Sequence, residues 1–258
     1  MYTLGIDIGA ATTKAVILNS GHILSHSKIP TGYKVKMAID EVVDLALERG
    51  EVKMDDMAYV VSTGYGRNSV DFANRTITEI LCHGRGVNFL FPAARTIIDI
   101  GGQDSKAISI DEKGDVVNFV MNDKCAAGTG RFLEVMAGVL GITVEEIGPL
   151  SLTSKNPCQI STTCTIFAET EMVSLRAEER EREDLLAGIV RAVASRVGVM
   201  ATNVGIKKEV IFTGGVANNV GVKKALEEKL GVEILVPEKP SLAGALGAAI
   251  LGYEAISR

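Results

Sequence analysis

Short apolar runs rich in β-branched residues alternate with polar turns at the start of the chain. Residues 2–8, 13–19 and 22–29 fit three consecutive strands, because each run is bounded by glycine or polar residues. A helical spacing of apolar residues over 36–49 follows, and then one more strand over 58–62. The opening of the chain therefore predicts three hairpin strands, a helix and a returning strand.

The same order of elements begins again near Arg95. Strands are expected over 95–100, 105–111 and 115–121, after which helical patterns dominate as far as Ile206. Because strands and helices alternate without a low-complexity linker, the sequence predicts an α/β protein. We expect two lobes: the first over 1–93, completed by a C-terminal helix over 242–258, and the second over 94–241.

Two glycine-flanked aspartates, Asp7 and Asp99, head nearly the same phrase. Each stands in an Ile-Asp-Ile-Gly turn followed by a hydroxyl-Lys-Ala segment, 13–15 in the first copy and 105–107 in the second, 92 positions later. A glycine turn lets backbone N–H groups approach a polyphosphate, and an aspartate at the strand end can hold a hydrated Mg²⁺. One such turn would be ordinary hairpin chemistry. Two copies in register favour a duplicated clamp, with the two aspartates facing each other across one nucleotide.

A third glycine phrase, residues 210–219, follows a strand and opens a helix expected to run to about Leu230. Gly214 and Gly215 leave no side chain between the backbone and an adenine or ribose, and the helix N-terminus favours phosphate oxygens. After the two Asp-Ile-Gly turns, this phrase resembles the actin-like ATPase superfamily of sugar kinases, heat-shock chaperones and actin. The resemblance implies two ribonuclease-H-like lobes with connecting helices over 76–89 and 241–253. Both helices carry the small residues of a close crossing, namely Gly84, Gly86, Gly244, Ala245, Gly247 and Ala248.

Composition argues against several other classes of protein. The formal net charge is −5 with scattered Lys and Arg, and 5% aromatic residues without Trp offer no stacking platform, so nucleic-acid binding is not expected. No cationic leader precedes the first strand at Tyr2, and the apolar stretch 241–253 is too short to span a bilayer. We therefore expect a cytoplasmic protein with no membrane partner.

Four cysteines set the chain apart from an ordinary kinase. A reducing cytoplasm disfavours disulfides, and the chain has no Cys-x-x-Cys pair. Cys82 falls in an apolar helical pattern and, with the neighbouring His83, is interpreted as structural. Cys158 lies in a strand-like segment and is either a core thiol or a near neighbour of a metal site.

Cys125 and Cys164 each stand immediately before a helical pattern, over 126–140 and 165–175 respectively. A helix N-terminus lowers a thiol pKa and favours an anionic ligand set such as a thiolate-bound iron–sulfur cluster. Two thiolates do not hold a [4Fe–4S] cluster, but a symmetric dimer supplies four on its twofold axis. From spacing alone, two thiols at capping positions remain the alternative.

The residues around these two cysteines carry a specific resemblance. Residues 122–132 and 161–169 closely resemble the cysteine segments of the 2-hydroxyacyl-CoA dehydratase activators, or archerases, in the family of the benzoyl-CoA reductase ATPase subunits. The loops at 62–67 and 98–104 and the turn at 212–217 also look like that family. The resemblance spans nearly the whole chain.

The resemblance implies an oxygen-sensitive homodimer with one bridging [4Fe–4S] cluster and one ATP site per subunit. Reduced ferredoxin or flavodoxin would load an electron, ATP binding would swing the lobes, and the electron would pass to a partner iron–sulfur enzyme. Hydrolysis of ATP to ADP would make the transfer one-way. The acceptor stays open among a 2-hydroxyacyl-CoA dehydratase, a benzoyl-CoA reductase-type enzyme and a double-cubane cluster protein.

The resemblance also implies which residues bind the metals and the nucleotide. Cys125 and Cys164 would ligate the cluster, and the two loop aspartates, Asp7 and Asp99, would hold a hydrated Mg²⁺. The positions expected to contact the nucleotide, besides Asp7, are Gly9, Ala10, Ala11, Thr12, Thr13, Lys14, Gly101, Gly102, Gly214, Gly215 and Asn218.

Three further residues have roles that the resemblance leaves less defined. Gln103, with Glu79 as a second candidate, would position the attacking water beside the metal held by Asp99. Lys106 is either a strand residue facing solvent or a phosphate ligand.

Two other functions are compatible with this fold. A small-molecule kinase would use the same clamp, but no segment obviously builds a substrate pocket, and Cys125 and Cys164 would be left unexplained. A non-catalytic ATP-switched protein would hold a structural zinc between subunits. An anaerobic absorption spectrum separates the cluster from zinc, because a cubane absorbs in the visible and zinc does not.

Overall fold

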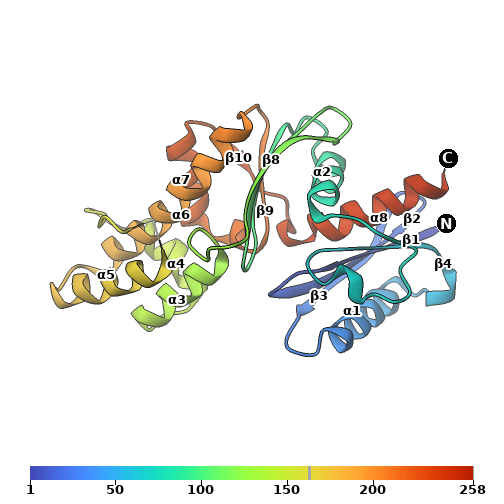
Figure 1. The fold of residues 1–258 in the computed structure, drawn as a ribbon, viewed down its shortest axis with the longest axis horizontal. Helices are drawn as coiled ribbons and strands as arrows, with labels where there is room; N and C mark the ends of the chain where they lie inside the picture. Colours follow the sequence, from blue (N-terminus) through green and yellow to red (C-terminus); the bar gives the residue numbers. More distant parts are fainter. Residues whose placement is uncertain (162–163, 258) are drawn as a thin grey trace. The chain divides into compact units, whose positions relative to one another are not determined.

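The computed structural model describes residues 1–161 and 164–257, so that Thr162, Thr163 and Arg258 lie outside the description. The chain divides into two compact units (Figure 1). The first unit comprises Met1–Ala94, Ile110–Val117 and Ser241–Arg258, and the second comprises Arg95–Ser109 and Asn118–Pro240. Each unit is built on one five-stranded mixed sheet, which confirms the α/β prediction.

The first unit has its sheet in the order β3-β2-β1-β4-β5. Its elements are β1 (Tyr2–Ile8), β2 (Thr12–Asn19), β3 (His22–Pro30), α1 (Val35–Gly50), β4 (Met57–Thr63), β5 (Arg75–Thr76), α2 (Glu79–Leu90) and α8 (Ala243–Ile256). Strand β1 pairs antiparallel with β2 and parallel with β4. Helix α1 packs on β2 and β3, and α8 packs on β1, β2 and β4 (Figure 1).

The alternation of side chains along β2 explains why helices cover both faces of this sheet. Ile17 belongs to the core beneath α1, whereas Val16 and Leu18 belong to the core beneath α8. On β1, a Cβ at Gly5 would overlap the backbone of Ala245 in α8. Asp7 lies two residues further along the same face, and therefore comes to the beginning of α8.

Helices α2 and α8 cross closely, as their small residues predicted. A Cβ at Gly86 would overlap the carbonyl oxygen of Ala243, and a Cβ at Gly247 would overlap that of Cys82. Gly84 was expected in the same crossing, but its Cβ position lies 2.6 Å from the carbonyl oxygen of Gly114 in the turn after β7. The two glycines of α2 therefore serve two different contacts.

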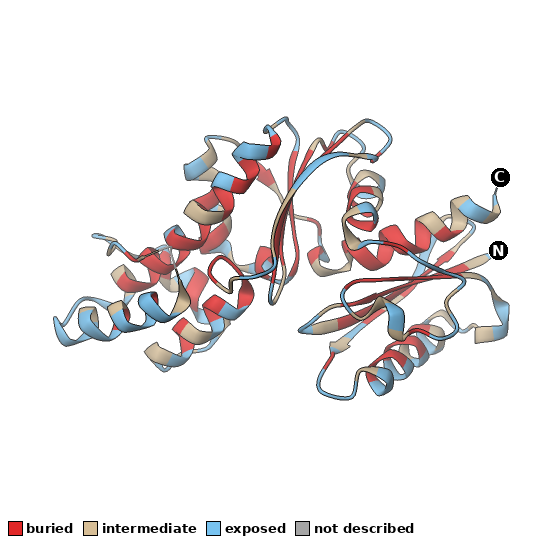
Figure 2. Ribbon diagram, in the orientation of Figure 1, coloured by how far each residue is buried: buried red, intermediate tan, exposed pale blue. Residues whose placement is uncertain are grey.

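The second unit has its sheet in the order β10-β9-β6-β7-β8. Its elements are β6 (Thr96–Ile100), β7 (Ser105–Ile110), β8 (Val116–Asn122), α3 (Gly130–Leu140), α4 (Val144–Ser151), α5 (Thr165–Ala177), α6 (Arg182–Val204), β9 (Val210–Thr213), α7 (Val220–Leu230) and β10 (Ile234–Leu235). Strand β6 pairs antiparallel with β7 and parallel with β9. One apolar core joins the sheet to helices α3 to α7, including Ile98, Phe132, Leu186, Val193 and Phe212 (Figure 2).

Helix α6 is the central helix of this core. By length and composition it could cross a membrane, but 72% of its apolar window is buried inside the protein. It packs against α4 and α7 (Figure 1). Burial within the unit accounts for its apolar character.

The predicted strands agree with the structure to within one residue at each end. The helix predicted directly after the third glycine phrase, residues 210–219, is present and ends at Leu230, as expected. A 3₁₀ turn, η3 (Gly215–Asn218), comes first, and α7 begins at Val220. The Asn219 side chain caps α7 by accepting a hydrogen bond from Val222 N at 3.0 Å, which fixes the helix start there.

Candidate functional site

The first candidate phosphate loop is the β1–β2 hairpin. A hydrogen bond from Gly9 N to Thr12 O, at 3.1 Å, closes its turn. Asp7 and Lys14 stand opposite each other in the ladder, and the Lys14 ammonium lies 3.0 Å from Asp7 Oδ2. Lys14 Nζ also lies 3.1 Å from the position of a Cβ at Gly9. The buried ion pair therefore holds a positive charge directly beside the turn.

The Asp7 carboxylate is closely surrounded within the first unit. Gly64 has a φ of 85°, and a Cβ there would lie 2.5 Å from Asp7 Oδ1. A Cβ at Gly244 would lie 3.1 Å from both Asp7 Oδ2 and His83 Cε1. The His83 ring is itself fixed, because its Nδ1 hydrogen-bonds the backbone oxygen of Glu79 at 2.9 Å. Glycine at 64 and 244 thus leaves room for the carboxylate.

The other residues predicted in this loop lie at different depths. Thr13 is fully buried, and its hydroxyl lies 2.9 Å from the hydroxyl of Thr31, which donates to Gly9 O at 2.7 Å. Thr13 therefore supports the turn from behind. Ala10 and Ala11 are exposed on the turn itself. The hydroxyl chain through Thr31 carries no local sequence signal, because its partners are distant in the chain.

The second candidate phosphate loop is the β6–β7 hairpin, whose aspartate has more partners. The Lys106 ammonium lies 3.3 Å from Asp99 Oδ2 and 2.5 Å from Asp104 Oδ2. Thr213 of β9 donates a hydrogen bond to the other Asp99 oxygen at 2.8 Å. Lys106 is only 2% exposed, so the solvent-facing alternative for this residue is wrong. Its charge is tolerated in the interior because two carboxylates compensate it.

The turn of the second loop is bonded to the beginning of α3. Gly130 N donates to Gly101 O at 2.9 Å, and Arg131 N donates to Gly102 O at 2.7 Å. A helix start leaves its first N–H groups without partners inside the helix, and here two of them bind the loop. Gln103, at the tip of the turn, is exposed.

The third glycine phrase forms a turn that only glycine fits. Gly214 has a φ of 87°, and a Cβ there would overlap the backbone of Ile100 at the end of β6. A Cβ at Gly215 would meet nothing within 4 Å, so this side of the turn is open. Asn218 donates its side-chain amide back to Gly215 O at 3.3 Å.

Cys125 lies in a loop, and the prediction that it stands at a helix N-terminus is wrong. Helix α3 begins only at Gly130. Residue Ala126 is instead part of a turn, because its carbonyl oxygen accepts bonds from Thr129 N at 3.0 Å and from Thr129 Oγ1 at 2.6 Å. Gly128 adopts a φ of 86°, which a helix does not allow.

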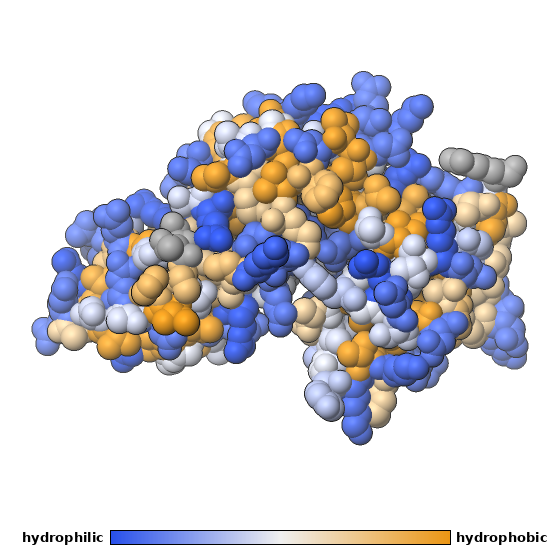
Figure 3. Space-filling view, in the orientation of Figure 1, coloured by the Kyte–Doolittle hydropathy of each residue, from blue (hydrophilic) through white to orange (hydrophobic). Residues whose placement is uncertain are grey.

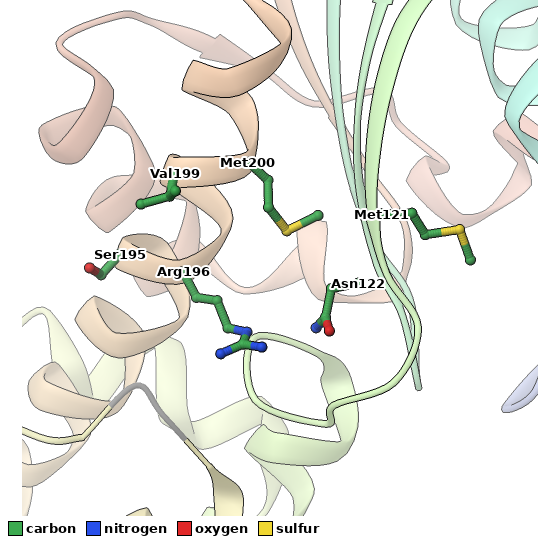
Figure 4. A pocket seen from close by; sticks show the side chains of 6 residues that line it. All are labelled: Met121, Asn122, Ser195, Arg196, Val199 and Met200. Carbon is green, nitrogen blue, oxygen red and sulfur yellow. The ribbon is translucent and has the colours of Figure 1, made fainter.

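Asn122 fastens the Cys125 loop to the end of β8. Its side-chain amide donates to Cys125 O at 2.8 Å and to Ala127 O at 3.2 Å. From the other side, the stem of Arg196 in α6 lies against the loop, with Cδ 3.1 Å from the Cβ position of Gly128. Between β8 and α6 lies a pocket of about 450 Å³ (Figure 4), lined by Met121, Asn122, Ser195, Arg196, Val199 and Met200.

Cys164 is the N-cap residue of α5, as predicted, and its thiol is half-buried. Ile166 and Phe167, which lie two and three residues after Cys164, are 69% and 64% exposed. Figure 3 shows apolar surface over the α3 and α5 part of this unit. Thr162 and Thr163, which belong to the same predicted segment, lie outside the described residues.

The remaining two cysteines differ from this pair. Burial raises the pKa of the Cys82 thiol to about 12, as expected of a core thiol. Cys158 is half-buried, and burial also raises its pKa. The strand-like interpretation of its segment is wrong, because residues 154–161 form neither helix nor strand. The Asp184 side chain accepts hydrogen bonds from this segment instead.

The donor set for a metal cluster is limited in a single chain. Over residues 1–161 and 164–257, no three His, Cys, Asp or Glu side chains gather in a way that could hold a metal ion. Cys125 and Cys164 are two half-buried thiols of the same unit, both unbridged. Such a pair fits one half of a four-thiolate ligand set that two subunits share.

Comparison with known proteins gives matches over almost the entire chain. Residues 4–252 match the profile of the BadF/BadG/BcrA/BcrD ATPase family. The activator of lactoyl-CoA dehydratase from Anaerotignum propionicum is 47% identical over 216 residues, which cover 84% of this chain and 83% of that protein.

Two solved structures are similar in both sequence and fold. Component A of (R)-2-hydroxyglutaryl-CoA dehydratase from Acidaminococcus fermentans matches with a TM-score of 0.96 and 45% identity, covering 100% of both chains. The activator of 2-hydroxyisocaproyl-CoA dehydratase from Clostridium difficile, with bound ADPNP, matches with a TM-score of 0.93 and 44% identity, covering 100% of this chain and 96% of that one. The fold is that of the actin-like ATPases.

Proposed function

The chain belongs to the BadF/BadG/BcrA/BcrD ATPase family, and on that basis we propose that it is an ATP-driven activator that delivers single low-potential electrons to a partner iron–sulfur enzyme. The observation that carries the proposal is the combination of features in one chain. Each of the two hairpin turns is preceded by a buried aspartate, and two unbridged, half-buried cysteines lie in the unit that contains the second turn. A kinase would need the turns but not the cysteines.

In the proposed nucleotide site, backbone N–H groups of both turns bind the phosphates of ATP. Asp7 and Asp99 would hold the hydrated Mg²⁺, and the turn of Gly214 and Gly215, which is open at Gly215, would lie under the nucleoside. The similar activator with bound ADPNP supports the binding of a nucleotide by this fold. The Lys14 ammonium, held beside the first turn, would add positive charge for the phosphates.

Hydrolysis of ATP by water gives ADP and phosphate, and it needs a group that orients the water. Gln103 is proposed for this role because its side chain is exposed at the tip of the second turn. Glu79 is the second candidate, as the first residue of α2. Its backbone oxygen bonds His83, whose ring lies beside Asp7.

Cys125 and Cys164 are the proposed ligands of a [4Fe–4S] cluster, two from each subunit of a homodimer. When bound, the cluster would accept one electron from reduced ferredoxin or flavodoxin and pass that electron to the acceptor. The apolar surface beside Cys164, with Ile166 and Phe167 exposed, fits a position where a second subunit excludes water from the metal. Electron transfer and ATP hydrolysis remain separate reactions that the protein couples.

A 2-hydroxyacyl-CoA dehydratase is the proposed acceptor, because the similar proteins are activators or components of such enzymes. The benzoyl-CoA reductase-type and double-cubane acceptors remain as alternatives from the sequence resemblance. We propose a cytoplasmic location, where ferredoxin or flavodoxin is available. No nucleic acid or membrane takes part in the proposed reaction.

Anaerobic purification with iron and sulfide analysis tests this function. We expect about four irons per dimer and broad visible absorption. Cys125→Ala and Cys164→Ala should each remove the cluster, whereas Cys158→Ala, the matched control among half-buried thiols, should keep it. A colourless dimer that contains zinc, or a protein that phosphorylates a small molecule without bound iron, would refute the proposal.

A further inference from the structure

We propose that Asn122 and the beginning of α3 are positioning elements that connect the second phosphate loop to Cys125. The inference rests on the proposed function, since it concerns how a nucleotide reaches a cluster ligand. All the contacts that carry it lie within the second unit.

The first step of the connection consists of two backbone hydrogen bonds. The carbonyls of Gly101 and Gly102 accept the N–H groups of Gly130 and Arg131. Each carbonyl shares a planar peptide with the next N–H group along the chain, so these two peptides also contain the N–H groups of Gly102 and Gln103. A phosphate that binds those N–H groups therefore acts on the same rigid planes that hold α3.

The close approach at this point favours glycine at position 130. A Cβ there would lie 3.1 Å from Gly101 O and 3.3 Å from Gly102 Cα. With no side chain between them, the helix start and the phosphate loop are in backbone contact. A rotation of either loop peptide is consequently transmitted to the first turn of α3.

The second step leads from α3 back to Cys125. The N-cap residue Thr129 is bonded through both its N–H and its hydroxyl to Ala126 O. This turn is compact, so the loop moves together with the helix start. Cys125 is the residue directly before the turn.

The third step is the anchor on the opposite side of the loop. Asn122 binds the carbonyls of Cys125 and Ala127, and the Arg196 stem packs on Gly128. Figure 4 shows the side chains of Asn122 and Arg196 extending toward each other from β8 and α6. The Cys125 loop is thus held to β8 and α6 at one side and to the second phosphate loop at the other. Because both sides are held, the Cys125 loop cannot follow a shift of the phosphate loop by moving as a whole. The shift changes the orientation of Cys125 instead.

A pair of glycine substitutions on α3 tests the first step. Gly130→Ala inserts a methyl group against Gly101 O, whereas at Gly138 in the same helix a Cβ would meet nothing within 4 Å. The rate of iron loss to a chelator is measured anaerobically with MgADP and with a non-hydrolysable MgATP analogue. For the wild type and Gly138→Ala we expect the two rates to differ by about 5-fold or more, the usual lower range for coupled sites.

For Gly130→Ala we expect the two rates to become nearly equal while the iron content stays at the wild-type value. A wild-type ratio in Gly130→Ala would overturn the inference and leave the proposed function intact. Absence of iron from the wild type would instead overturn the proposed function. The two failures are therefore distinguishable.

A second pair of variants tests the anchor independently, including the case in which Gly130→Ala does not fold. Asn122→Leu keeps a side chain of similar size but donates no hydrogen bond, and Ser195→Ala is the control in the same pocket. We expect Asn122→Leu to lose iron about 10-fold faster or more, because the variant loses two hydrogen bonds of ordinary strength, and to change the electron paramagnetic resonance spectrum of the reduced cluster. Ser195→Ala should match the wild type in both. An unchanged spectrum and rate in Asn122→Leu would refute the anchor.

Discussion

Replacement of Lys106 by methionine tests the ion cluster of the second phosphate loop. Methionine retains the apolar stem of the side chain and removes the ammonium, which lies 2.5 Å from Asp104 Oδ2 and 3.3 Å from Asp99 Oδ2. The variant leaves two buried carboxylates of the same charge without their cation. We expect Lys106→Met to destabilise the second unit strongly.

The magnitude follows from the loss of charge compensation. Removal of one partner from a buried ion pair costs about 3–5 kcal/mol, and Lys106 compensates two carboxylates, so the upper part of this range applies. With a urea dependence of about 2 kcal/mol/M, the unfolding midpoint should fall by roughly 2 M. The double variant Lys106→Met/Asp104→Asn should recover about 1–3 kcal/mol, because one of the uncompensated charges is gone.

Urea unfolding at neutral pH, followed by circular dichroism, measures these effects. Lys14→Met is the matched comparison in the first unit, since its ammonium compensates one carboxylate, that of Asp7. We expect the loss to be smaller in Lys14→Met than in Lys106→Met. The reasoning is refuted if Lys106→Met keeps the wild-type midpoint, or if the double variant is no more stable than Lys106→Met alone.

Three further predictions concern other parts of the chain. Gln103→Ala should lower the turnover number for ATP with little change in nucleotide affinity, measured by steady-state kinetics and equilibrium binding, because the side chain acts on the water; wild-type turnover would remove it from the mechanism. Cys82 should resist alkylation in the folded protein at mildly alkaline pH and react after unfolding, because burial raises its pKa to about 12; a labelled native Cys82 in peptide mass analysis would contradict this. Hydrogen bonds from the Ser154 hydroxyl and the Asn156 N–H lower the pKa of Asp184. The Asp184 carboxylate therefore stabilises the folded protein fully above its unfolded pKa of 3.8, and this contribution is lost as pH falls through the folded pKa. The midpoint difference between wild type and Asp184→Ala should accordingly shrink on acidification, and a difference independent of pH would contradict the assignment.

Local sequence patterns predicted the strands and the glycine turns well. Alternating β-branched runs bounded by turns specify β1 and β6 by themselves, because their period and their ends are local. The turn at Gly214 was also predicted, from its glycines. The structure explains why glycine stands there, because both the φ of 87° and the contact with the end of β6 require a residue without Cβ. Strands and turns of this kind are predicted from the sequence because their signals are local.

The helix after Cys125 was predicted to begin at Ala126, but α3 begins at Gly130. Gly128, with a φ of 86°, and the N-cap residue Thr129 are local features that fit this later start, and the prediction did not use them. The loop before α3 is also held by the Asn122 amide from β8 and by the Arg196 stem from α6. These tertiary contacts have no local sequence signal.

The burial of Lys106 also depends on tertiary structure. A lysine in a strand that alternates with apolar residues normally faces solvent. Here the face is covered, and the residue is acceptable only because Asp99 stands opposite it and Asp104 lies two residues before it. The two aspartates can be seen in the sequence. The burial of Lys106 cannot be predicted from it, because that burial depends on the packing of the whole second unit.

The two phosphate loops keep the same cross-strand Asp–Lys pair and differ by one charge. In the first loop Asp7 and Lys14 sum to zero, whereas in the second Asp99, Asp104 and Lys106 sum to one negative charge, from two carboxylates and one ammonium. A divalent cation is attracted more strongly to the loop with the surplus carboxylate. The Lys14 ammonium, in contrast, lies beside its turn, where a phosphate would arrive. The two hairpins therefore share one cross-strand geometry, and the additional carboxylate gives the second hairpin the more negative charge, which is consistent with the proposed role of Asp99 in holding Mg²⁺.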